Sequence, residues 1–210
     1  MIIEQILVTG MAVFCYLVVD ESTKEAVLID PAGDFDAIYS KVDKHHATVR
    51  YVINTHGHYD HTSGNDHVMK RSGAKLLIHK NDLSYIRGFD RDDTADFSQE
   101  MKNPGAKVLL LNHNDSIKFG NSQLWVMHTP GHSAGCICLY GSDNIFTGDT
   151  LFTEGVGRTD LPDSSERDLA DSIRNKILAL PDHTKIWPGH HYGRNPVSTV
   201  AEQKKYYGIK

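Results

Sequence analysis

The stretch "NTHGHYDHTSG", residues 54–64, places three histidines and one aspartate within six consecutive positions. The run "VRYVINT" that leads into it has the composition of a strand, so we expect a strand that ends at the cluster. If the extended backbone continues, His56 and His58 point the same way, whereas Asp60 and His61 require a turn. Neutral imidazoles and carboxylates bind metal ions, and each ion takes about four ligands. The cluster therefore predicts part of a two-metal site that needs further ligands.

Three later segments offer such ligands. The motif "TPGHSAG" carries His132, "FTGDT" carries Asp149 and "WPGHH" carries His190. Each ligand-type side chain follows an apolar run and a glycine, an order that all three segments share. Because sites are commonly built where strand ends meet at one edge of a sheet, we expect all these side chains to converge there.

The overall composition bounds the class of protein. The chain has 210 residues, of which 40% are hydrophobic, and its net charge of -5 with no Lys/Arg run argues against a nucleic-acid binder. Cys15, Cys136 and Cys138 lie in apolar runs, which indicates buried strand residues of a reducing compartment. No signal peptide and no apolar run of about 18 residues is found, so we expect a cytoplasmic protein without a membrane partner.

The order of the expected elements predicts the fold. An opening meander of three strands is followed by helices and further strands, and "SSERDLADSIRNKILALP" predicts the best helix, capped by Ser165 with Asp168 completing a capping box. Residues 87–105 are acidic and irregular, so we expect a long loop that is either a functional lid or a solvated insertion. Two sheets with helices outside them give an α+β, four-layer αββα sandwich, which we expect as a single domain over residues 1–210.

The motifs "THGHYDH", "TPGHSAG", "FTGDT" and "WPGHH" together resemble the metallo-β-lactamase superfamily, over nearly the whole chain. The resemblance implies the same αββα sandwich. It also implies two metal ions that share one bridging carboxylate, Asp149. The first ion would be held by His56, His58, His132 and Asp149, and the second by Asp60, His61, His190 and Asp149.

A narrower resemblance follows Asp149. The segment "GDTLFTEGVGRTDLP" is similar to the hydroxyacylglutathione hydrolase (glyoxalase II) branch and its short relatives. In that branch a tyrosine at the position of Tyr192 and a basic residue at the position of Arg158 contact the thiol substrate. Only about twenty residues follow His190, so we expect no C-terminal helical glutathione-binding domain. For Arg158 an ion pair with Asp160 or Asp163 is the alternative.

These residues favour hydrolysis of a small-molecule thioester. Two cations sharing a hydroxide would activate it for attack on a carbonyl, and a thiol of pKa about 8.5 leaves without a proton donor. Asp60 is expected to be chiefly a ligand and also to accept the proton of the hydroxide. Zinc is the expected ion, with iron and manganese as alternatives, and the sequence leaves the oligomeric state open.

Two other functions remain open at this point. The persulfide dioxygenases share "GRTD" and the ligand skeleton, and that resemblance implies a single iron held by His56, His132 and Asp149. A non-enzymatic metal-binding or partner-binding domain is the third reading, and loss of a ligand would be its usual sign.

Overall fold

The computed structural model describes residues 1–209. One sheet has seven strands in the order β1-β2-β3-β4-β5-β7-β6, and a second has six in the order β15-β14-β11-β10-β9-β8. A separate pair, β12 (Leu151–Phe152) and β13 (Gly155–Val156), forms a small hairpin. The strands of the two sheets are β1 (Ile2–Val8), β2 (Val13–Val19), β3 (Glu25–Ile29), β4 (Thr48–Ile53), β5 (Lys75–His79), β6 (Thr94–Asp96), β7 (Val108–Leu111), β8 (Ser116–Phe119), β9 (Ser122–His128), β10 (Ile137–Gly141), β11 (Asn144–Gly148), β14 (Lys185–Pro188) and β15 (Ser198–Thr199).

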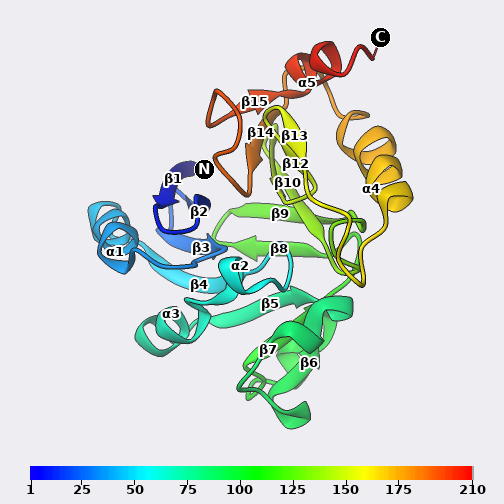
Figure 1. Ribbon diagram of the computed structural model, residues 1–210. Helices are drawn as coiled ribbons and strands as arrows, with labels where there is room; N and C mark the ends of the chain where they lie inside the picture. Colours follow the sequence, from blue (N-terminus) through cyan, green and yellow to red (C-terminus); the bar gives the residue numbers. More distant parts are fainter. Residues whose placement is uncertain (210) are drawn as a thin grey trace.

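Helices flank both sheets (Figure 1). Among the described residues, none of them is both long and apolar enough to cross a lipid bilayer. The α-helices are α1 (Phe35–Lys44), α2 (Tyr59–Thr62), α3 (Asn65–Ser72), α4 (Glu166–Ser172) and α5 (Val200–Tyr206). Short turns of other helix types are η1 (Lys80–Tyr85), η2 (Arg91–Asp93), η3 (Phe97–Lys102) and η4 (Ile173–Ile177), the last a π-helix that continues α4.

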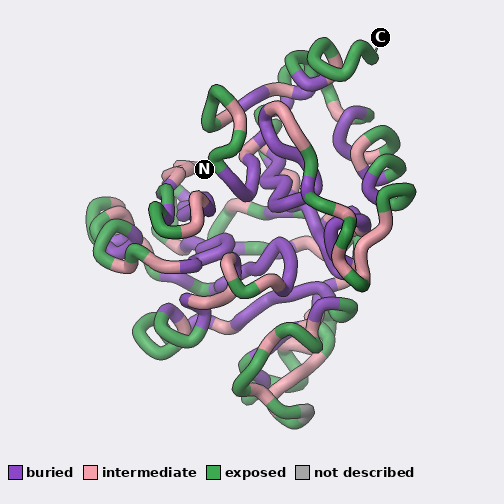
Figure 2. Tube along the Cα trace, viewed as in Figure 1, coloured by how far each residue is buried: buried purple, intermediate pink, exposed green. Residues whose placement is uncertain are grey.

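The apolar side chains of β2 show why the sheets stack in layers. Phe14, Tyr16 and Val18 point into the cluster between the two sheets, whereas Cys15 and Leu17 point into the cluster beneath α1 and α3. Successive side chains of a strand alternate between faces, so a strand covered on both sides is apolar throughout. A third cluster joins the second sheet to η4 and α5. Figure 2 shows these buried strands inside exposed helices, and the predicted αββα sandwich is confirmed.

The capping signals explain where two of the helices begin. The Ser165 side chain accepts a hydrogen bond from the Asp168 backbone amide at 3.2 Å, which caps α4 as predicted. The reciprocal half of that capping box is not among the contacts of Ser165 and Asp168. A complete box is found instead at α5, between Thr199 and Glu202.

The expectation of one long loop over residues 87–105 is wrong. The segment contains η2, η3 and the strand β6, which pairs in parallel with β7 at the edge of the first sheet. The strand is only three residues long, "TAD", and therefore has too few alternations to be recognised from sequence. Asp96 then caps η3 by accepting from the Ser98 amide at 2.9 Å.

The directions of the strands bring the ligand-bearing loops together. β3 and β4 are parallel, so both end at the same edge of the first sheet. In the second sheet β11 is parallel to β14. Both β9 and β11 are antiparallel to β10, so β9 runs in the same direction as β11 and β14. The two edges are joined by a β-bridge between Val13 and His190. We call the line where these two edges meet the seam. The segments predicted to carry ligands all follow strands that end at this seam.

Candidate metal centre

Three histidines from two loops form the first half of the site. His56 and His58 follow β4, and His132 follows β9, and their ring nitrogens lie within 4.8 Å of one another. Nδ1 of His58 and Nε2 of His132 are 2.9 Å apart. His56 and His132 are buried, while His58 is partly exposed toward the cleft.

The second half combines the short helix α2 with the end of β14. Asp60 and His61 lie on α2, and His190 follows β14. Nε2 of His61 is 3.1 Å from Nε2 of His190, which in turn lies 3.4 Å from Oδ2 of Asp60. The turn that the sequence required after His58 is therefore α2, which directs these two side chains to a second point.

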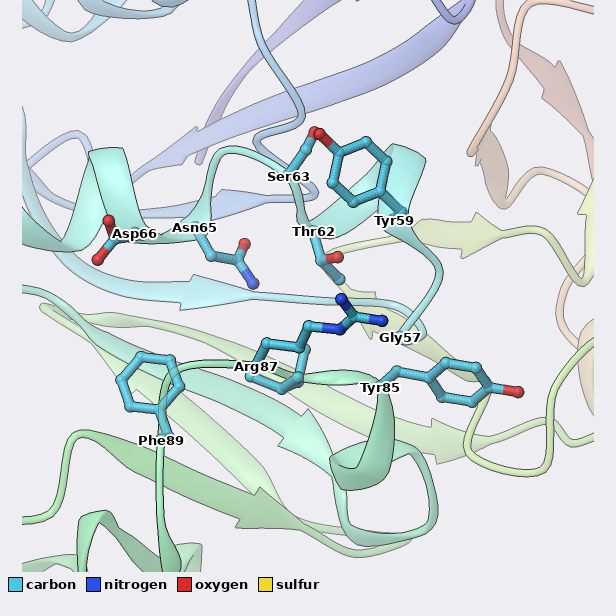
Figure 3. A pocket seen from close by; sticks show the side chains of 10 residues that line it. Gly57, Tyr59, Thr62, Ser63, Asn65, Asp66, Tyr85, Arg87 and Phe89 are labelled. Atoms are coloured by element: carbon cyan, nitrogen blue, oxygen red, sulfur yellow. The ribbon is translucent and has the colours of Figure 1, made fainter.

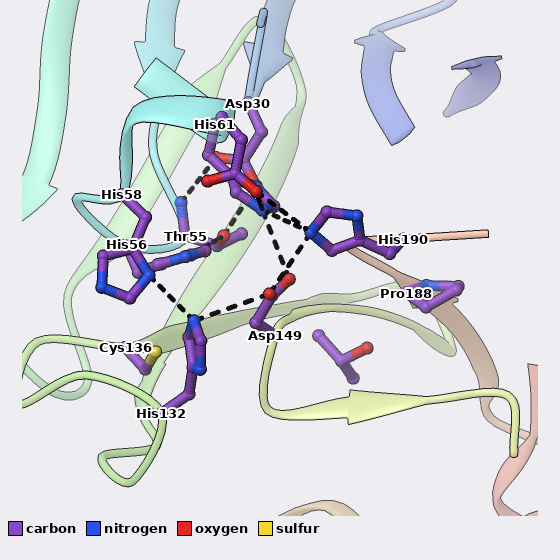
Figure 4. A network of polar contacts seen from close by, with 12 residues as sticks. Asp30, Thr55, His56, His58, His61, His132, Cys136, Asp149, Pro188 and His190 are labelled. Atoms are coloured by element: carbon purple, nitrogen blue, oxygen red, sulfur yellow. Dashed lines mark hydrogen bonds and ion pairs between the residues drawn. The ribbon is translucent and has the colours of Figure 1, made fainter. Parts of the chain in front are cut away.

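Asp149, at the end of β11, lies between the two halves (Figure 4). Its carboxylate oxygens are 3.6 Å from Nε2 of His132, and 3.3 Å from Nε2 of both His61 and His190. Burial acts to raise the pKa of Asp149, but the adjacent His61 and His190 outweigh it and lower that pKa well below its ordinary value. The carboxylate is thus ionised and faces both groups of histidines.

The backbone at Gly148 allows Asp149 to reach this position. Gly148 has a φ of +47°, and a Cβ there would lie 2.5 Å from Oγ1 of Thr55. Only glycine adopts this conformation against such a close neighbour without strain. The "FTGD" order in the sequence therefore has a structural cause at this strand end.

The arrangement fits metal ions. A zinc ion with tetrahedral ligands at about 2.0–2.1 Å holds those ligand atoms about 3.4 Å from one another, close to the distances found here. Nε2 of His56 is buried without a hydrogen-bond partner, and Oδ1 of Asp149 is buried with the 3.3 Å ion-pair contact to Nε2 of His61. Buried polar atoms are rarely left unpaired, so the unpartnered Nε2 of His56 facing a buried carboxylate is the arrangement expected of side chains that bind a cation. The grouped side chains are His56, His58, Asp60, His61, His132, Asp149 and His190.

The pKa shifts of His56 and His190 agree with metal binding at this site. Burial, together with nearby His61, lowers the pKa of His56 well below its ordinary value, so its imidazole is neutral and able to bind a metal. Burial also acts to lower the pKa of His190, but the Asp149 and Asp60 carboxylates raise it to about 9. The carboxylates therefore favour positive charge at the place where a metal ion would supply it.

Asp30, at the end of β3, supports the site and was not predicted. Its Oδ2 lies 3.0 Å from Nδ1 of His61 and accepts a hydrogen bond from Oγ1 of Thr55 at 2.6 Å. A carboxylate on the second nitrogen of a metal-binding histidine fixes the ring orientation and its tautomer. The signal was present in "LIDP", an aspartate directly after an apolar strand, as in "FTGD".

Asp82, on η1, joins two ligand loops and was also not predicted. Its buried carboxylate accepts hydrogen bonds from the Gly57 amide at 2.9 Å and from the Ser133 hydroxyl at 2.7 Å. Gly57 separates His56 from His58, and Ser133 follows His132. One side chain thereby ties the loops of all three histidines in the first half, which only the tertiary structure could show.

A cavity of about 820 Å³ opens over the two groups of ligands, and Arg158 and Tyr192 both line it. Tyr192 is 63% exposed and stacks on the His190 ring, with centroids 4.5 Å apart. Arg158 makes two hydrogen bonds with Asp160, at 2.6 and 2.7 Å, so in this structure the ion-pair alternative is the one observed. Its carbonyl oxygen lies 2.9 Å from Nδ1 of His132.

Comparisons with known proteins agree with this geometry. A family model described as "Metallo-beta-lactamase superfamily" matches residues 8–190. A hydroxyacylglutathione hydrolase of Pelagibacter ubique (strain HTCC1062) is 33% identical over 200 residues, covering 94% of this chain and 74% of the relative. The probable polyketide biosynthesis zinc-dependent hydrolase PksB of Bacillus subtilis (strain 168) is 29% identical over 193 residues, covering 92% and 79%. The crystal structure of ETHE1 from Myxococcus xanthus matches with a TM-score of 0.82 and 30% identity, covering 98% of this chain and 83% of that one. The chain belongs to the metallo-beta-lactamase superfamily.

Proposed function

We propose that the protein is a two-metal hydrolase of thioesters, similar in reaction to hydroxyacylglutathione hydrolase. Members of its superfamily are metal-dependent hydrolases, and this chain keeps a complete set of ligand-type residues. The observation that carries the proposal is the position of Asp149, within 3.3 to 3.6 Å of histidines from both halves of the site. One carboxylate between two groups of ligands is the arrangement expected of a bridging residue.

The chain's own residues would accept the proton from water and position the substrate. Bound divalent ions supply a Lewis acid and activate water at neutral pH. Asp60 is 39% exposed at the floor of the cavity, so its free oxygen can accept the proton that water loses. Tyr192 stacks on the ring of His190, and Phe152 packs edge to face against both rings, so Phe152 and Tyr192 form an apolar wall that positions the substrate.

The choice of a thioester rests on the leaving group. A thiol has a pKa of about 8.5, so a thiolate departs at neutral pH without a proton donor, whereas an amide nitrogen must be protonated. Burial and the neighbouring Asp163 raise the pKa of Tyr85 to about 12, which makes this cavity-lining hydroxyl a weak acid. The Pelagibacter relative, named for a thioesterase reaction, supports the same choice.

The test uses purified protein loaded separately with zinc, iron or manganese. We expect two metal ions per chain and hydrolysis of S-lactoylglutathione or another acylthiol. The Asp149→Asn variant should lose at least one ion and about 100-fold or more in kcat/KM, because it removes the shared ligand charge. Asp143→Asn, a carboxylate 60% exposed on the surface, serves as the matched control and should match the wild type.

One alternative has a distinct result in the same experiment. A single iron per chain, with oxygen uptake on glutathione persulfide, would replace the hydrolase by a dioxygenase that uses His56, His132 and Asp149. Loaded protein that turns over no acylthiol would reject the thioesterase proposal.

A further inference from the structure

A second pocket, of about 460 Å³, lies beside the metal-ligand loop and has no role in the reaction described above (Figure 3). One wall runs from Gly57 through α2 to Asp66, and the other is the segment from Tyr85 to Phe89, which reaches into the start of the stretch predicted to be a lid or an insertion. Tyr85 lines this pocket and also the cavity over the ligands. The two spaces are therefore neighbours that share one side chain.

The pocket contains a cation without a counterion. Arg87 is exposed and takes part in none of the ion pairs found among the described residues. In Figure 3 its guanidinium extends toward Gly57, between Thr62 and Tyr85. The carboxylate of Asp66 also lines the pocket, but it pairs with Lys70 at 2.6 Å. The charge left unmatched in the pocket is positive and fits a carboxylate, which a guanidinium binds through two parallel hydrogen bonds.

The walls around Arg87 are largely apolar and aromatic. Tyr59 is 78% exposed although it lies inside the ligand motif, and Tyr85, Ile86 and Phe89 add further apolar surface. The polar part of the lining comes from Thr62, Ser63, Asn65 and Asp66. Large exposed aromatic side chains at a concave surface are typical of a ligand site. The ligand that this pocket suits is thus an apolar chain with a negative charge at its far end.

The orientation of a thioester follows from the position of Tyr85. The Tyr85 ring packs edge to face on the ring of His58, with centroids 5.3 Å apart. Arg158 and Tyr192, the residues expected to contact the thiol carrier, line the larger cavity and not the second pocket. In a bound substrate the thioester carbonyl would lie at the ligand-type residues and the thiol would point toward Tyr192. The acyl chain would then extend past Tyr85 into the second pocket.

We propose that the pocket formed by Tyr59, Tyr85 and Arg87 binds the carboxylate at the far end of a dicarboxylic acyl group, so that the substrates are ω-carboxyacyl thioesters. This inference rests on the proposed thioesterase function and specifies its acyl group. Arg87 acts here as a specificity residue that contacts substrate away from the reacting carbonyl.

The test compares acyl chains of equal length on one neutral carrier, N-acetylcysteamine. The wild type should prefer the adipoyl over the hexanoyl thioester in kcat/KM. Arg87→Gln should reduce that preference about fivefold, the value of a solvent-accessible charge-assisted contact. Arg50→Gln makes the same charge change at the opposite end of β4, and it should leave the preference as in the wild type.

Further measurements distinguish binding of the acyl group from binding of the thiol carrier and from absence of thioesterase activity. If Arg87→Gln changes the preference for glutathione over the neutral carrier, and not that for adipoyl over hexanoyl, the pocket binds the carrier and the proposal is overturned. Binding to chelator-treated protein is measured in parallel with S-hexylglutathione and its ω-carboxylated counterpart. Equal binding of the two thioethers would overturn the pocket assignment, whereas tighter, Arg87-dependent binding of the carboxylated one supports it. Absence of turnover with every acylthiol would instead reject the proposed function.

Discussion

At the scale of single residues, the site is defined by which atoms have partners and which do not. The ring of His61 uses Nδ1 on Asp30, at 3.0 Å, and so presents Nε2 to the centre. The ring of His132 does the same through the Arg158 carbonyl, at 2.9 Å. By contrast, Nε2 of His56 is buried with no partner at all. A histidine held on one nitrogen and free on the other is oriented for metal binding.

Asp30→Ala is expected to weaken metal binding without contacting a metal itself. Loss of a carboxylate that orients a ligand histidine typically costs 10- to 100-fold in metal affinity, so about that loss is expected. Competition with a chromophoric chelator measures it. Asp20→Ala is the control, because it also removes a buried carboxylate with several hydrogen bonds, but one that caps the β2–β3 turn. Equal loss of affinity in both variants would show that Asp30 acts only through general stability.

At the scale of elements, loops that are distant in sequence are held in register by single side chains. Asp82 on η1 connects the loop after β4 to the loop after β9. Glu4 on β1 connects that strand to the end of α1 through Lys41, Lys44 and His45, at 2.9, 2.7 and 2.6 Å. Each contact fixes where an element ends, which local propensity alone leaves undefined by a few residues.

Asp82 provides a prediction about loop positioning. An asparagine can accept both hydrogen bonds through its one carbonyl oxygen, since both now fall on Oδ2. Asp82→Asn should therefore keep the electronic spectrum of the cobalt-substituted protein, whereas Asp82→Ala should alter it and lower metal affinity by about tenfold or more. An asparagine variant as impaired as the alanine variant would mean that the charge, and not the hydrogen bonding, is required.

Glu4 provides a prediction about pH. Its hydrogen bonds with Lys44, His45 and Lys41 lower the pKa of Glu4 from 4.5 to about 2. A carboxylate with a depressed pKa in the folded state contributes stability above its unfolded pKa and loses it as the pH falls toward the folded value. Glu4→Gln should thus lower the free energy of unfolding at pH 7 by about 1 kcal/mol, allowing for solvent screening.

The difference between the wild type and Glu4→Gln should then shrink as the pH falls below about 4.5. Urea unfolding at a series of pH values measures it, and contributions common to both proteins cancel. Glu21→Gln, whose carboxylate is 65% exposed, is the control and should change stability little at any pH. A difference that stays constant down to pH 3 would contradict the assignment.

At the scale of the whole molecule, the cores and the site are separate. The cluster between the sheets and the cluster beneath α1 and α3 consist of apolar side chains and contain none of the ligand-type residues. The ligands lie instead along the seam where the two sheets meet, which the Val13–His190 bridge crosses. The scaffold can therefore form from its apolar patterning, with the seam adding stability when metal binds.

Metal removal should lower stability without unfolding the protein. Metal bound at about 100 to 1,000 times its dissociation constant adds about 3–4 kcal/mol, which corresponds to roughly 10 °C in Tm for a chain of this size. Calorimetry before and after treatment with a chelator, with far-ultraviolet circular dichroism at 25 °C, tests this. Loss of the circular dichroism signal on chelation would show that the sandwich depends on its metals.

The sequence by itself determined the layers of this protein and which ligand-type side chains are grouped together. Alternating apolar runs predict the meander and the later strands because the side-chain period of a strand is two, and two such sheets must bury their apolar faces on each other and on helices. The grouping of His56, His58, Asp60 and His61 is local, and His132, Asp149 and His190 share the order of strand, glycine and ligand. The sequence therefore predicted that these seven side chains come together in the fold.

Only the tertiary structure decided what surrounds those ligands. Asp30 and Asp82 are aspartates among many in the sequence, and they became part of the site because parallel strand ends and a turn of 3₁₀-helix bring them within hydrogen-bonding distance of the loops. The short strand β6 forms only because the edge of β7 is there to pair with it. Arg158 pairs with Asp160 in this structure, a contact that the sequence offered only as the alternative to contact with the substrate. Such contacts depend on distances across the fold, which no local sequence pattern encodes.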